Sequence, residues 1–253
     1  MVPARPASLT LIFAILLLRS LAAQSAPAST AQAAQSAQEP AWQSAIEARR
    51  KQLVDQNGPG TDAPLRAQLL QMLALDQRAR GFSVAPAQPG RGQTAPAKEL
   101  LQSLPATDAQ LTLELKQIVE QKGWPTISLV GLDASNAALL VLTHTADHAW
   151  QLQLLPQLEQ MADANKIDAS SLAIVIDKEL VSEGKLQRYG TQFKVVNGGM
   201  AMFGVEEPAT LDQRRAKALL PPLDVYKMTL EAMYHLKATN AIVSATPVKP
   251  PQN

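Results

Sequence analysis

The stretch LQRYGTQFKVVNGGMAMFGV, residues 186–205, is where the hydrophobic pattern of this chain changes. Apolar residues alternate with polar ones here, whereas elsewhere they recur three or four positions apart. Asn197-Gly198 separates two such runs, and Asn-Gly is the preferred pair for a two-residue type I′ turn. The pattern therefore predicts a β-hairpin from Leu186 to Val205. On one face the first strand would carry Tyr189, Thr191, Phe193 and Val195, and on the other Arg188, Gly190, Gln192 and Lys194.

The rest of the chain has the pattern of helices. Hydrophobic residues make up 46% of the sequence, but aromatic residues only 4%, so a core must consist mostly of Leu, Ile, Val, Ala and Met. That composition favours helices over a β-sandwich. We therefore expect a mainly α fold: a single helical domain of about seven or eight helices, with one β-hairpin near the C-terminal third.

Polar residues directly before apolar runs predict where the helices begin. Asp62, Asp147 and Asp168 have the positions of N-cap residues. Thr107 with Gln110, and Thr210 with Gln213, have the spacing of capping boxes. The sequence therefore predicts helix starts at these five points, with further helices over residues 41–56 and 133–145.

Residues 1–23 have the features of a secretory signal peptide. Arg5 supplies the positive charge, the apolar run Leu9–Leu18 follows, and cleavage is expected after Ala22 or Ala23, or slightly later at Ser25. The alternative is an uncleaved anchor, but a run of about ten apolar residues is too short to cross a bilayer as a helix. We expect an exported protein, periplasmic or extracellular, with no stable membrane span after cleavage.

Composition divides the remaining chain into a domain and its tails. Residues 24–40 are rich in Gln, Ser, Ala and Pro and predict a disordered linker before a helical domain over residues 41–236. Inside the domain, residues 83–97 hold repeated Pro and Gly and predict a long flexible loop. A polar, proline-bearing tail over residues 237–253 is expected to be disordered.

Charge and residue usage exclude several classes of function. The 23 Lys and Arg residues nearly balance the 22 Asp and Glu residues, so the chain has no strong positive electrostatic field that would attract nucleic acid. There is no cysteine, which excludes disulfides and thiolate sites.

His144 and His148 have a spacing that two zinc ligands can share, but Thr145 stands where a metalloprotease needs Glu. Asp147 as an N-cap would also break the helix between them, so no metal and no cofactor are expected.

Polar and aromatic residues without an evident packing role gather in three segments that are far apart in the sequence. They are Trp124, His144, Tyr189, Thr191 and Gln192. We expect them to line one polar cleft between the central helices and the hairpin. The alternatives are that Trp124 fills a helix junction and that hairpin packing alone accounts for Tyr189 and Phe193. Asp76, Gln77, Arg80 and Asp147 complete the candidate site.

Two groups of charged residues are interpreted as solvent-exposed. Asp76 and Arg80 are four residues apart, the usual geometry of a surface ion pair on a helix, which contributes about 0.3–0.5 kcal/mol. The run Asp177-Lys178-Glu179 could offer a carboxylate to a site, but a solvated charged face is the plainer interpretation.

Three hypotheses of function follow from these residues. The first is an exported binding or interaction module whose polar cleft takes a small molecule or a protein partner. The alternative is a hydrolase-like enzyme with His144 as general base, oriented by Asp147 or Asp76. It requires His144 to lie within hydrogen-bond reach of another polar side chain at the floor of a cleft, and it fails if His144 points into solvent or is sealed in apolar packing. The third is a structural envelope protein that tethers partners through its tails.

Several short motifs carry a resemblance to a known family. They are Asp76-Gln77 with Arg80, Gly123-Trp124-Pro125-Thr126, Leu129-Val130-Gly131, Ala137-Ala138, His144 with Ala146-Asp147, Gln187, Tyr189-Gly190-Thr191-Gln192-Phe193, and Arg214-Arg215. Through them the chain resembles the bacterial domain-of-unknown-function family six-six-two-four, over roughly residues 42–235. It departs at Thr143, where the family usually shows Gln, and at Lys178-Glu179, where the family usually shows Asp followed by Arg-Val. The family has no assigned activity, so the resemblance implies positions and no mechanism.

Overall fold

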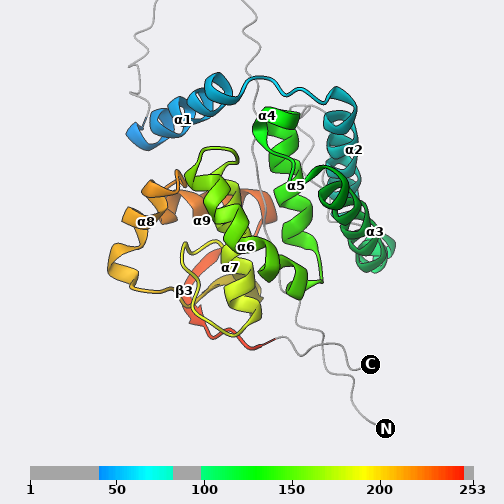
Figure 1. The fold of residues 1–253 in the computed structure, drawn as a ribbon. Helices are drawn as coiled ribbons and strands as arrows, with labels where there is room; N and C mark the ends of the chain where they lie inside the picture. The colour runs from blue at the N-terminus through cyan, green and yellow to red at the C-terminus, as the bar shows by residue number, and fades with distance from the viewer. Residues whose placement is uncertain (1–39, 82–97, 248–253) are drawn as a thin grey trace, which may run out of the picture.

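A computed structural model of the chain describes residues 40–81 and 98–247. Nine α-helices and a three-stranded sheet lie within these ranges (Figure 1). The helices are α1 (Ala41–Asn57), α2 (Ala63–Ala79), α3 (Lys98–Lys122), α4 (Ile127–Val130), α5 (Leu132–His144), α6 (His148–Asp163), α7 (Ala169–Ser182), α8 (Leu211–Lys217) and α9 (Leu223–Tyr234). The strands are β1 (Phe193–Val196), β2 (Gly199–Phe203) and β3 (Ala238–Val243).

The predicted mainly α fold is confirmed. Three predicted segments lie outside the described residues: the signal peptide (1–23), the linker up to residue 39, and the loop 83–97. Within the described ranges, no helix combines the length and the apolar character needed to cross a membrane.

Helix α5 is the centre of the helical part. Every residue from Ala134 to His144 is buried, because α2 and α3 pack on one side of the helix and α7 on another (Figure 1). A helix that is apolar on all sides must be covered on all sides. The polar residues at its C-terminal end are therefore drawn into the interior along with the apolar ones.

The aspartate N-caps are confirmed and the capping boxes are wrong. The side chains of Asp62, Asp147 and Asp168 each accept a hydrogen bond from a backbone N–H in the first turn of α2, α6 and α7. Thr107 lies inside α3, and its hydroxyl bonds the carbonyl of Ser103 four residues back. That alternative bond is available to any threonine within a helix, so Thr107 does not mark a helix start. Thr210 does stand at the N-cap position of α8, so that predicted helix start is confirmed, but its side chain makes no cap hydrogen bond.

The sheet confirms the predicted turn and corrects the predicted tail. Strands β1 and β2 form an antiparallel hairpin around Asn197-Gly198, whose φ angles of 51° and 78° are those of a type I′ turn. Strand β3 lies parallel to β2 after the α9 crossover, so residues 238–243 are ordered and not a disordered tail. Four of its six residues, Ala238, Ala241, Ile242 and Val243, are apolar, and its backbone pairs with β2.

Candidate functional site

The last turns of α2 and α5 bring a carboxylate and an imidazole together. Oδ1 of Asp76 lies 2.7 Å from Nδ1 of His144, and both side chains are buried. The same oxygen accepts a hydrogen bond of 2.7 Å from Arg80, while Oδ2 accepts one of 2.8 Å from Gln77. Four of the residues predicted for the site, Asp76, Gln77, Arg80 and His144, therefore form one hydrogen-bonded group.

The expected surface ion pair between Asp76 and Arg80 is instead part of the interior. The two side chains are paired as predicted, but Asp76 is 0% exposed and Arg80 only 15%. Arg80 also donates to Asp108 of α3 at 2.8 Å. The side chain of Asp108 is 19% exposed, so this edge of the network is where it meets solvent.

His144 is held as a neutral imidazole. Burial lowers the pKa of His144 below its ordinary value of 6.5, although the hydrogen bond and charge of Asp76 act in the opposite direction. Burial also tends to raise the pKa of Asp76, but His144, Arg80 and Gln77 together lower it below 3.8. Nδ1–H of the neutral ring therefore donates to an ionised carboxylate. Nε2 is left with a buried lone pair that has no hydrogen-bond partner in the described part of the chain.

Lys178 of α7 lies against the backbone on both sides of His144. Its ammonium donates to the carbonyl oxygens of Thr143 and Thr145, and the second of these bonds is 3.2 Å long. The Thr145 hydroxyl accepts a hydrogen bond from Thr112 of α3. The end of α5 is thus fixed from α3 and α7 as well as from α2.

A second carboxylate–imidazole pair lies beside the first. Nδ1 of His148 is 2.9 Å from Oε1 of Glu179, which is buried on α7.

Asp147, the other predicted partner of His144, instead caps α6 through the Trp150 amide and pairs with Lys116. The carboxylate that orients His144 is therefore that of Asp76.

The segment from Arg188 to Gln192 is a loop and not a strand, which corrects the predicted hairpin. The buried carboxylate of Asp177 accepts hydrogen bonds from the amides of Arg188, Tyr189 and Thr191 and from the Thr191 hydroxyl, all of 2.7–2.9 Å. These amides cannot serve a β-ladder at the same time, so strand β1 begins only at Phe193. Burial raises the pKa of Asp177, although the four hydrogen bonds act against this.

Residues from α8 and α9 close the other side of this loop. The Arg215 guanidinium is fully buried and donates to the carbonyl oxygens of Tyr189 and Pro221, and it lies 4.9 Å from the centre of the Tyr226 ring. The Tyr226 hydroxyl donates to the Thr191 carbonyl. Gln192 is also buried and bonds Gln187 and Thr191. The polar atoms of the Tyr-Gly-Thr-Gln-Phe motif thus bond within the protein.

Trp124 does not join His144, contrary to the expectation of a single cleft. Its side chain is buried in the core at the start of the α4–α5 segment. Thr112 of α3 bonds Thr145, the residue after His144, and α3 continues for ten more residues to Lys122, roughly 15 Å at 1.5 Å per helical residue, before Trp124 follows. The structure therefore separates the predicted residues into the His144 network, the Asp177 loop and Trp124.

The three consecutive charged residues of α7 lie in the interior. Asp177, Lys178 and Glu179 are all buried, so the solvated charged face expected for them is wrong. The signal that could have identified them is their surroundings in the sequence. The residues before them, Leu172 to Ile176, and after them, Leu180 and Val181, are apolar, which leaves this helix no polar side on which charges could be exposed.

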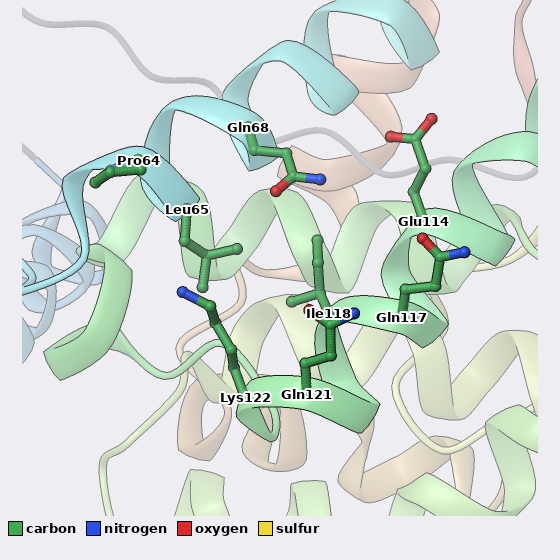
Figure 2. Close-up of a pocket in the computed structure, with 8 residues that line it drawn as sticks. All are labelled: Pro64, Leu65, Gln68, Glu114, Gln117, Ile118, Gln121 and Lys122. Carbon is green, nitrogen blue, oxygen red and sulfur yellow. The ribbon is translucent and has the colours of Figure 1, made fainter.

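Within the described residues there is no metal cluster, and the hollow found there is lined by residues other than those predicted for the site. No group of three or more His, Asp or Glu side chains that could hold a metal ion occurs within residues 40–81 and 98–247. An open hollow of about 190 Å³ lies between facing turns of α2 and α3 (Figure 2). It is lined by Pro64, Leu65, Gln68, Glu114, Gln117, Ile118, Gln121 and Lys122, none of which was predicted for the site.

Comparison with known proteins gives one match. A model described as a family of unknown function (DUF6624) matches residues 63–239, more than half of the chain. The match runs from α2 into β3 and so includes the His144 network and the Asp177 loop. No curated protein and no solved structure matches the chain.

Proposed function

The chain belongs to the family of unknown function DUF6624, and we propose from the geometry of its buried network that it is a hydrolase-like enzyme with His144 as general base. The observation that carries the proposal is the buried imidazole of His144, which Asp76 holds in place. Its Nδ1–H is bound by Asp76, and its Nε2 lone pair is left without a partner in the described residues.

This arrangement can take a proton from an attacking water molecule once that water reaches Nε2, which is buried in the structure. Nε2 of His144 takes the proton while the water oxygen bonds to the electrophilic atom of the substrate, and the proton then passes to the leaving group. Asp76 fixes the tautomer and stabilises the imidazolium that forms during the step. Arg80 and Gln77 in turn hold Asp76 in position.

The geometry favours catalysis over a binding module built from the predicted cleft. Thr191 and Gln192, which such a module would use to contact its ligand, are buried: the Thr191 hydroxyl donates to Asp177 of α7, and the Gln192 amide donates to the Thr191 hydroxyl. In the predicted set, Nε2 of His144 and Nε1 of Trp124 are buried without a hydrogen-bond partner among the described residues, and of the two only Nε2 can accept a proton.

The test of this proposal is hydrolysis of a panel of chromogenic esters, amides, phosphoesters and glycosides. His144→Gln and Asp76→Asn are each expected to lower turnover by about 10²–10⁴-fold, the usual contribution of a general base. The wild-type rate is expected to hold at pH 6.5 and to fall only at lower pH, because burial keeps the pKa of His144 below its ordinary value.

The matched control is His235→Asn, at an exposed histidine with φ of 54° that ends α9, where asparagine is well tolerated. Ring ¹⁵N spectra provide a readout that needs no substrate. They should show His144 neutral and protonated on Nδ1 at pH 6.5. A charged ring, or a proton on Nε2, would contradict the proposal.

We also propose that the chain is exported through residues 1–23, on the sequence features given above. Expression of the full chain in a bacterial host should yield a periplasmic or secreted form whose N-terminus follows Ala22 or Ala23. Arg5→Glu should reduce export, because the charge of the segment before the apolar run sets its orientation. A chain that retains Met1 and remains in the cytoplasm would refute the proposal.

A further inference from the structure

Lys178 is a buried cation beside the proposed base. Its ammonium donates to the carbonyl oxygens of Thr143 and Thr145, the residues immediately before and after His144. These two bonds use two of its three N–H donors. The ammonium is therefore held at the end of α5, next to the backbone that carries the imidazole.

The carboxylates around Lys178 are bound to other groups. Asp76 and Asp108 are bound by Arg80, and Glu179 by His148. Within the described residues, Lys178 forms no salt bridge of its own, and its hydrogen bonds are to neutral carbonyl groups. Burial of a charge without a counterion is unfavourable unless a ligand supplies one.

A purely structural role for Lys178 explains only part of this arrangement. Lysine often binds the last carbonyls of a helix, and here it binds those of α5. Such a cap is normally exposed, however, whereas burial lowers the pKa of Lys178 to about 8. The charged groups that act on it are Arg80 from α2, Asp108 from α3 and the adjacent Glu179.

Two incomplete groups thus lie within electrostatic range of each other: the Lys178 ammonium, which has no salt bridge among the described residues, and the Nε2 lone pair of His144, which has no donor there. We propose that the site takes a substrate with an oxyanion, such as a phosphate group, which Lys178 binds while His144 accepts a proton from a neighbouring O–H group. This inference rests on the proposed function and adds the class of substrate to it.

The test compares binding of inorganic phosphate and sulfate by calorimetry at pH 7 and constant ionic strength. At this pH phosphate carries both negative charge and a P–OH donor, whereas sulfate carries charge alone. We expect the wild type to bind both ions, and phosphate more tightly. His144→Gln should reduce phosphate affinity to that of sulfate. Lys178→Met should weaken both by at least about tenfold, as expected for loss of a charge-assisted hydrogen bond.

The control is Lys116→Met, at a half-exposed lysine that pairs with Asp147 and should leave both affinities unchanged. If Lys178→Met does not fold, the pH dependence of sulfate binding to the wild type is the test. Sulfate binding should then be lost at about pH 9.5, where the ammonium is neutral. Equal binding by wild type and Lys178→Met, sulfate binding retained at that pH, or no binding by the wild type would each overturn the inference. The general-base role is judged separately, on the turnover of His144→Gln.

Discussion

Replacement of Asp177 by alanine is expected to lower the free energy of unfolding by about 3–5 kcal/mol. The Asp177 carboxylate is fully buried and accepts four hydrogen bonds from Arg188, Tyr189 and Thr191. Without it, three backbone N–H groups lose their acceptor. Each such group costs about 1–3 kcal/mol when it is left buried and unpaired.

Urea unfolding followed by circular dichroism measures this change. The matched control is Glu183→Ala, which removes an exposed carboxylate near the end of the same helix and should stay within about 0.5 kcal/mol of the wild type. Hydrogen exchange at the amides of Tyr189 and Thr191 should also accelerate in Asp177→Ala. A loss below about 1 kcal/mol would show that the loop is held by Arg215 and Tyr226 without the carboxylate.

Replacement of Asp76 by alanine is the second change with a large expected effect, again about 3–5 kcal/mol. It leaves the Arg80 guanidinium with one ion pair, to Asp108, in place of two, and it leaves the Nδ1–H of His144 without an acceptor. The control has the same i,i+4 spacing: Asp55→Ala breaks the pair with Lys51, whose side chains are 75% and 60% exposed. That change should stay within about 0.5 kcal/mol. Similar losses of unfolding free energy in Asp76→Ala and Asp55→Ala would refute the burial of Asp76.

The lowered pKa values of Asp76 and His144 also predict how the stability of the protein depends on pH. The pKa of Asp76 is lowered below 3.8, so its contribution to stability is present above that pH and is lost as pH falls through the lower, folded-state value. The pKa of His144 is lowered below 6.5, so its contribution is likewise present above 6.5 and is lost towards lower pH. Asp76→Ala should therefore show a weaker acid destabilisation below pH 3.8 than the wild type. Equal acid slopes would contradict this assignment.

The candidate site was predictable in part because one of its pairs is local. Asp76 and Arg80 are one helical turn apart, so their contact could be expected from spacing alone. That His144 joins them depends on a contact between residues 68 positions apart. Asp76 was therefore one of two carboxylates that could orient His144 until the packing of α2 against α5 was known.

The sequence alone determined what depends on neighbours within a few residues: the mainly helical composition, the aspartate caps at Asp62, Asp147 and Asp168, and the turn at Asn197-Gly198. These features are decided by hydrogen bonds and backbone angles within a single turn. Only the tertiary structure decided which charges are buried, where the Asp177 carboxylate binds, and that residues 238–243 form a strand. Those outcomes depend on segments that meet only after the chain has packed, and the same local pattern is compatible with a surface ion pair, a solvated helix face or a disordered tail.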